Sequence, residues 1–482
     1  MAEATELSTL LKQEFIPTSG RAPEPVEAAL RTLAQLALAA PQLIGQDAAR
    51  TVEALIASID RKSTEQINLI LHHEEFQQLE SAWRGLYYLV SNTETDETLK
   101  IRVLDVSKKV LAKILKKYKG TAWDQSPIFQ LVYEQEYGQF GGEPYGCLVG
   151  DYYFDHSPPD VELLSALAQV AAAAHTPFLA GTSPALLQMD SWQELSNPRD
   201  PTKILQTPEY TAWHALRRSE DARYLGLTLP RFLARLPYGI KTNPVPEFDF
   251  EENVNGPDTR GYVWANSAYA MGVNITRAFK AYGWCARIRG FESGGTVEDL
   301  PCPWFPTNDL AVDQKLPTET GISDRREAEL SRQGLMLLVH RKNSAAAAFV
   351  SAQSLQQPAE YDDPEATTNA HLSARLPYLF PTCRFAHYLK CIVRDKIGSF
   401  KGRDELQTEL RDWILNYVEP NPAAVSEEGR ARRPLTAAEV IIETVEGRPG
   451  TYASKFFLRP HFQLEGLTMS LRLVSRLPSA EG

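Results

Sequence analysis

The sequence is poor in several features that mark particular classes of protein. Its 482 residues include only five cysteines, at positions 147, 285, 302, 383 and 391. An odd and scattered set does not form a disulfide framework, and it suits a reducing compartment. The first residues, MAEATELSTLLKQEF, lack the positive region and apolar core of a signal peptide. We therefore expect a cytoplasmic protein.

Long hydrophobic runs and an excess of basic residues are also absent. The most apolar helical stretch, residues 161–174, is interrupted by Glu162 and Gln169 and is too short to span a bilayer. The 50 Lys and Arg residues are outnumbered by 61 Asp and Glu residues, which gives a net charge of −11. Because an acidic surface repels nucleic acid, we expect no nucleic-acid binding, and because the most apolar stretch is too short to span a bilayer, we expect no membrane insertion.

Motifs for catalysis and nucleotide binding are missing as well. The sequence has neither a G-x-x-x-x-G-K-S/T phosphate loop nor a G-x-G-x-x-G after a strand. Residues 181–184 (GTSP) lack the second glycine of a nucleophile elbow. After HHEE at 72–75, Gln77 stands where a second zinc ligand would be needed. We predict no catalytic residue and no cofactor, and we expect the carboxylates of Glu251 and Glu252 on solvated surface.

One group of metal-ligating residue types has helical spacing. Cys383, His387 and Cys391 stand four residues apart. Two adjacent members could share an ion, but the outer two are about 12 Å apart on a helix that rises 1.5 Å per residue. Because free cysteine packs as a small hydrophobe, we interpret this group as one half-buried helix face and predict no metal site.

The sequence does contain alternating helical and strand-like patterns. Residues 63–66 (STEQ) fit a capping box at the start of a long helix that runs to about Val90. Its predicted apolar face consists of Ile67, Leu71, Leu79, Trp83, Leu86 and Val90. Strands are predicted at 99–106, 145–153, 178–181 and 335–340, and helices at 108–118, 127–137, 161–174 and 267–282. This alternation predicts an α/β, mixed α+β, fold.

The pattern divides the chain into three parts. Residues 1–58, interrupted by prolines, are expected to form an arm, residues 59–370 the central α/β domains, and residues 371–482 a C-terminal module. A polar, acidic stretch at 356–369 is the best linker candidate. The module is predicted to have helices at 381–397 and 406–417 and strands at 439–445, 452–459 and 467–474. Because the last strand has one apolar face, it needs a neighbour to cover its edge.

Seven short segments resemble the large subunit of the contractile sheath of type VI secretion systems. They are IDRKS (59–63), ESAWRGL (80–86), GDYYF (150–154), LPYG (236–239), RFAHYLK (384–390), RDKIG (394–398) and FLRPHFQLE (457–465). Each segment is weak by itself, but their order is specific, and the resemblance covers nearly the whole chain after residue 58.

The resemblance implies a structural subunit of a bacterial, cytoplasmic sheath, related to phage tail sheaths, without catalysis of its own. It implies a small sheath subunit as partner in a heterodimer, further copies of the chain in a helical polymer, an inner tube protein, a baseplate, and an AAA+ ATPase that recycles the contracted sheath. Contraction would propel the tube and its spike for effector delivery.

Terminal segments of that family exchange strands between protomers, so the C-terminal β-module is expected to serve this purpose here. The predicted inter-protomer strand interface consists of Val440, Ile442, Leu467, Met469, Leu471 and Leu473. The alternatives are a sheath protein of a related phage-like contractile injection particle and, in a different class, an α/β hydrolase-type enzyme.

Overall fold

The chain forms two compact units. The computed structural model describes residue 35 and residues 48–196, 200–254, 256, 258–306, 312–396, 402–444, 452–461 and 463. The first unit combines Met1–Leu79 with Leu236–Tyr262, and the second combines Glu80–Arg235 with Val263–Gly482.

The first unit is built on helix α3 (Ala48–Leu71) and the loop that follows residue 236. The Asn68 side-chain oxygen accepts a hydrogen bond from the main-chain N–H of Asn253 at 2.7 Å. Glu252 is only 7% exposed, and its carboxylate accepts the N–H of Tyr238 at 2.8 Å. The expectation that Glu252 lies on solvated surface is therefore wrong, because its carboxylate closes a turn of this loop.

The single long helix predicted up to Val90 is two helices. A turn at His72 and His73 separates α3 from α4 (Glu74–Ser91). Ser63 lies inside α3, so the predicted capping box is wrong; serine is tolerated inside helices, and the pattern alone does not locate a helix start. Helix α3 also crosses residue 58, the end of the predicted arm.

From Glu80 onward, where α4 belongs to the second unit, it buries a different face from the predicted one. Gly85 and Leu89 are buried, and a Cβ atom on Gly85 would lie 2.5 Å from the ring of Tyr269. Trp83 and Val90, from the predicted face, are 65% and 45% exposed. The apolar stripe that periodicity identifies is therefore largely exposed, and α4 packs through the side that carries Gly85 and Leu89.

A six-stranded sheet forms the centre of the second unit, in the order β1-β2-β3-β9-β10-β6. The strands are β1 (Leu148–Phe154), β2 (Phe178–Thr182), β3 (Leu225–Leu229), β6 (Thr296–Val297), β9 (Leu335–His340) and β10 (Ala347–Phe349). Strands β1, β2, β3 and β9 are parallel, and β10 pairs antiparallel with both β9 and β6. The predicted mixed α/β fold is confirmed, and β1 is one edge of the sheet.

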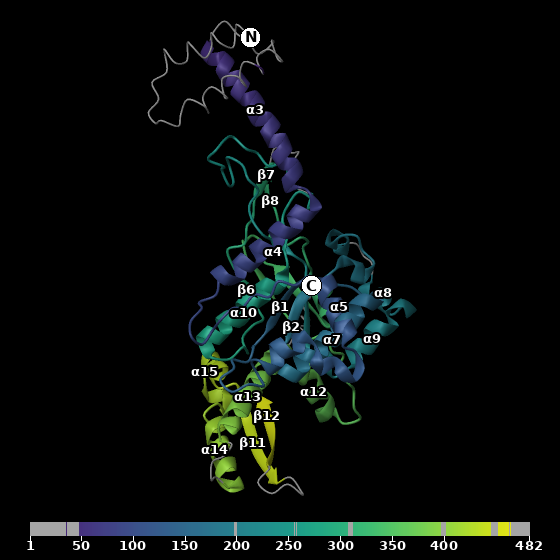
Figure 1. Ribbon diagram of the computed structural model, residues 1–482, viewed down its shortest axis with the longest axis vertical. Helices are drawn as coiled ribbons and strands as arrows, with labels where there is room; N and C mark the ends of the chain where they lie inside the picture. Colours follow the sequence, from purple (N-terminus) through teal and green to yellow (C-terminus); the bar gives the residue numbers. More distant parts are fainter. Residues whose placement is uncertain are drawn as a thin grey trace, which may run out of the picture. The chain divides into compact units, whose positions relative to one another are not determined.

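Helices cover both faces of this sheet (Figure 1). Helices α5 (Lys108–Lys117) and α7 (Pro158–Ala174) share a core with Ala180 of β2. Its neighbour Leu179 joins the opposite core, with α10 (Ser267–Tyr282). Strands that are buried on both faces have nearly continuous apolar sequences, which is why β2 and β9 could be predicted.

Other predictions for this unit were less accurate. Strand β3 was missed, because Gly226 and the following Pro230 weaken its signal. Residues 99–106 do not form a strand. The predicted linker at 356–369 is helical in its second half, where α12 (Pro364–Ser373) begins with its N-terminus capped by the Asp363 carboxylate.

Shorter elements complete the second unit. They are α6 (Pro127–Phe129), α8 (Pro201–Leu205), α9 (Thr211–Arg218), α11 (Asp324–Ser331), β4 (Phe232–Leu233), β5 (Trp264–Ala265), β7 (Trp304–Pro306) and β8 (Val312–Gln314), with a π-helical turn at Gln130–Glu134.

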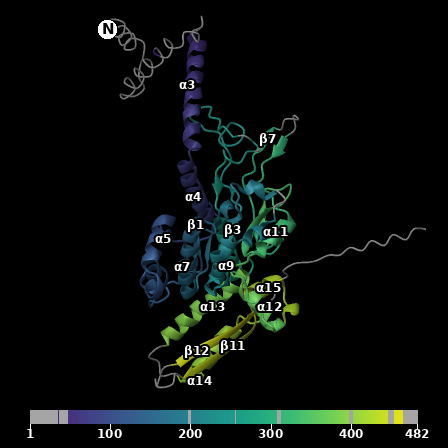
Figure 2. The same ribbon diagram turned by 90° about the vertical axis from the view of Figure 1, so that its right-hand side faces the viewer.

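The C-terminal module consists of α13 (Leu376–Asp395), α14 (Arg403–Leu415), α15 (Glu427–Arg432), β11 (Leu435–Thr444) and β12 (Tyr452–Pro460) (Figure 2). Its two predicted helices and first two strands are confirmed, whereas the predicted strand at 467–474 lies outside the described residues. Helix α13 belongs to two cores. Leu379 and Cys383 pack with the central sheet, and Phe385 and Leu389 pack with α14 and β11.

Candidate assembly interface

Strands β11 and β12 form a two-stranded antiparallel hairpin against α14. Val440 and Ile442 of β11 are 4% and 3% exposed and pack in the same core as Leu410 and Ile414 of α14. The side chains of these two predicted interface residues therefore stabilise the module itself. Any strand exchange at β11 has to use main-chain groups.

The outer edge of β11 offers such groups. The N–H of Ile442 points away from β12 and donates to the side-chain oxygen of Gln407 at 3.1 Å. In an antiparallel ladder, alternate residues direct their main-chain groups to the same side, so those of Val440 also face outward. Near the start of the strand, Leu435 donates its N–H to the Tyr417 carbonyl at 3.2 Å. Within the described part of the chain, the edge is thus covered at both ends and open around Val440.

Gln407 was not identified from the sequence. It is a polar residue on a charged helix, and nothing in the pattern of α14 indicates that its side chain reaches a strand edge. The remaining predicted interface residues, Leu467, Met469, Leu471 and Leu473, lie outside the described residues.

Strand β12 forms the other edge of the hairpin. Among the described residues, β12 pairs only with β11. On the face that points away from α14, Phe457 is 55% exposed, and Lys455 forms an ion pair with Glu443 at 2.8 Å. Exposed strand edges are templates for pairing with another chain. Among the described residues, the module therefore exposes the edge of β12 and the part of the β11 edge around Val440.

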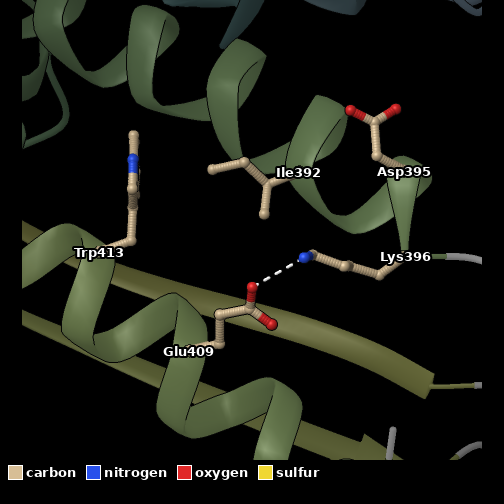
Figure 3. A pocket seen from close by; sticks show the side chains of 5 residues that line it. All are labelled: Ile392, Asp395, Lys396, Glu409 and Trp413. Carbon is tan, nitrogen blue, oxygen red and sulfur yellow. Dashed lines mark ion pairs between the residues drawn. The ribbon is translucent and has the colours of Figure 1, made fainter. Parts of the chain in front are cut away.

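A shallow cleft of about 350 Å³ lies between α13 and α14 (Figure 3). Ile392 and Trp413 form apolar walls, and an ion pair between Lys396 and Glu409 at 2.8 Å crosses it. The Asp395 carboxylate lies at the rim and points away from this pair. A paired lysine and carboxylate beside apolar walls suit packing against another surface better than they suit acid–base chemistry.

Cys383 and His387 are buried in the fold, whereas Cys391 is only partly buried. Cys383 is buried in the sheet core, and burial raises the pKa of its thiol well above the ordinary value. The His387 ring is 2% exposed and donates from Nε2 to the Ala174 carbonyl at 2.8 Å. Burial lowers the pKa of His387 to about 3. No cluster of three or more metal-ligating side chains occurs among the described residues.

A second polar contact also holds α13 against the central part of the unit. The Lys390 ammonium donates to the hydroxyl of Tyr133 at 3.0 Å and lies 3.7 Å from the ring centre of Tyr137. A cation over an aromatic face is stabilised by the charge distribution of the ring.

Two structural contacts lie at the carboxyl edge of the parallel strands, where α/β proteins usually bind ligands. Arg231, just after β3, forms a two-pronged ion pair with Glu319 at 2.9 and 2.8 Å. The Asn266 side chain caps α10 by accepting the N–H of Ala268 at 3.0 Å and donates to the Tyr152 carbonyl at 3.2 Å.

An exposed edge of a hairpin is a general type of site for strand addition by another chain. Two adjacent family models match the chain. The EvpB/VC_A0108 tail sheath N-terminal domain matches residues 53–356, and the tail sheath gpW/gp25-like domain of the same family matches residues 365–477. The chain belongs to the EvpB/VC_A0108 tail sheath family. The two models meet close to the predicted boundary at 370, which stays a prediction.

A curated relative shows which kind of tail sheath protein the chain resembles. The chain is 67% identical over 479 residues, covering 99% of this chain and 96% of the relative, to the type VI secretion system sheath protein TssC1 of Pseudomonas aeruginosa. The chain is a type VI secretion sheath subunit, a structural protein, as the resemblance in the sequence indicated.

Solved structures of another contractile particle are more distant. The anti-feeding prophage baseplate matches with a TM-score of 0.40 and 11% identity, over 79% of this chain and 84% of that chain. The contracted helical sheath of the same particle matches with a TM-score of 0.31 and 10% identity, over 64% and 66%. Within the described residues, no helix has the length and apolarity to cross a membrane.

Proposed function

We propose that the chain pairs with a small sheath subunit and polymerises with copies of itself around an inner tube in the bacterial cytoplasm. Contraction of this polymer propels the tube and spike for effector delivery. A baseplate and an AAA+ disassembly ATPase are its further partners. The chain performs no catalysis, and its C-terminal module links protomers by exchanging strands.

The observation that carries the strand-exchange proposal is the hairpin of β11 and β12. Its core side is filled by the chain's own residues, while the main-chain edge around Val440 is open within the described part. Adding a strand there satisfies backbone groups without disturbing the packed core. The apolar alternation of residues 467–474 provides a suitable strand.

Charge substitutions on opposite faces of that strand test the proposal. Leu471→Asp places a carboxylate on the apolar face, and burying an unpaired charge costs more than detaching the strand. We expect this variant, co-expressed with the small subunit, to form the two-protein complex but no filaments in negative-stain images. The matched control is Ser470→Asp, whose side chain points to the opposite face and which should still form filaments.

Two results would count against the proposal. Normal filaments from Leu471→Asp would show that this strand links no protomers. A wild-type chain that neither binds the small subunit nor forms filaments would refute the pairing itself.

A further inference from the structure

Residues 100–106 form an open segment beside the edge of the central sheet. Their sequence, KIRVLDV, has the alternation of a strand, yet the structure gives them no regular secondary structure. Strand β1, which they accompany, is the outermost strand on its side of the sheet. A sequence suited to a strand thus lies next to a sheet edge without joining it.

Contacts at both ends hold the segment in place. Ile101 packs in a small cluster with Leu89 and Val149. At the other end, the Val106 carbonyl accepts a hydrogen bond from the hydroxyl of Tyr152 at 2.6 Å. The path from residue 101 to residue 106 therefore follows β1 in the same direction.

Charged side chains add to this attachment. Arg102 forms ion pairs with Glu136 and with Glu143, the latter at 3.2 Å, and Lys100 also pairs with Glu143. These charges are already neutralised within the chain, so they do not select a partner by themselves. They fix the position of the main chain.

The middle of the segment is left uncovered. Val103 is 67% exposed and Leu104 is 58% exposed. No main-chain N–H or C=O of residues 100–105 takes part in a hydrogen bond with another described residue. Neighbouring residues of a strand point to opposite faces, so an added strand would bring apolar cover to both sides.

We propose that residues 100–106 receive a β-strand of the small sheath subunit, with apolar side chains on both of its faces. This site rests on the proposed pairing of the two subunits, and it specifies where on this chain the small subunit binds. A row of main-chain groups is satisfied in full only by another extended chain. A second copy of the same segment is a poor occupant, because pairing it with itself requires a twofold axis, whereas subunits of a helical sheath repeat head to tail.

The structure also indicates which side of the segment the strand occupies. In β geometry, residues two apart direct their main-chain groups to the same side. The Val106 carbonyl is held by the Tyr152 hydroxyl of β1, so a bound strand that imposes β geometry on the segment directs the main-chain groups of Leu104 and Arg102 toward β1 as well. Residues 101, 103 and 105 then face away from β1, where the partner strand adds.

Proline substitutions at adjacent positions test this geometry on the full chain co-expressed with the small subunit. Proline removes one N–H donor. We expect Val103→Pro to weaken the complex at least about tenfold, because its N–H faces the partner, and Leu104→Pro to weaken it several-fold less. Val103→Ala keeps the main-chain donor, so its affinity for the small subunit should be similar to that of Leu104→Pro.

Hydrogen exchange on the wild-type complex provides a measurement without substitutions. The amides of residues 101, 103 and 105 should exchange at least about tenfold more slowly than in the unfolded chain. Exchange of all three at the unfolded rate, or equal affinity of both proline variants and wild type, would overturn this site while leaving the proposed pairing intact. If the wild-type chain does not bind the small subunit at all, the proposed pairing fails, and this site fails with it.

Discussion

The buried histidine of α13 should make the stability of the sheath subunit depend on pH. His387 has an ordinary pKa of 6.5, which burial lowers to about 3 in the folded chain. A base with a depressed pKa stays neutral in the fold, so the unfolded chain binds more protons as the pH falls below 6.5. The contribution of His387 to the free energy of unfolding is fully present above pH 6.5 and decreases as the pH falls toward 3. At pH 5 the loss is about 2 kcal/mol, since each pKa unit corresponds to about 1.4 kcal/mol.

His387→Gln tests this calculation, because the glutamine amide can still donate to the Ala174 carbonyl but does not titrate. The free energy of unfolding should be measured by urea denaturation at pH 7.5 and pH 5.0, on the complex with the small subunit at constant concentration. We expect the wild type to lose about 2 kcal/mol more than the variant between these pH values. His371→Gln, an exposed position on α12, is the control and should behave like the wild type. Parallel losses in wild type and His387→Gln would refute the reasoning.

Two further substitutions test contacts of the second unit, both by urea denaturation of the same complex. Lys390→Met keeps the apolar stem but removes the charge that lies over Tyr137, and it should cost about 1–2 kcal/mol, whereas Lys390→Arg should cost less. An unchanged stability of Lys390→Met would show that the cation contributes nothing. Gly85→Ala forces a methyl group against Tyr269 and should cost about 1–3 kcal/mol. Trp83→Ala on the exposed face of the same helix should change stability by less than about 0.5 kcal/mol, and equal effects at both positions would contradict the packing.

The parts of the fold that could be predicted are those where one physical signal dominates. Residues 335–340 are apolar throughout, because β9 is buried on both faces, and this run could be assigned directly. Helix α10 was predicted with its observed ends; Asn266 caps its start and Gly283 ends it in a left-handed conformation.

Other features depend on contacts that the sequence does not encode locally. Residues 99–106 have strand-like alternation, but no strand of the chain pairs with them among the described residues. The packed face of α4 is set by the close approach of Gly85 to α10, which no periodicity indicates. At the candidate interface, Val440 and Ile442 were correctly placed in a strand, but the sequence could not distinguish a buried side chain from an exposed strand edge.

Helix α13 sets a mechanical limit on what the subunit can do. Because one helix supplies Leu379 to the sheet core and Leu389 to the core of the C-terminal module, it acts as a splint between them. Rotating the C-terminal module relative to the sheet would require α13 to break or the side chains of α13 to leave one of these two cores. A rotation imposed on the C-terminal module is therefore passed to the sheet with little deformation between the two. When the sheath shortens, the deformation therefore has to occur in the links between subunits. The second unit of each subunit then moves as a rigid body.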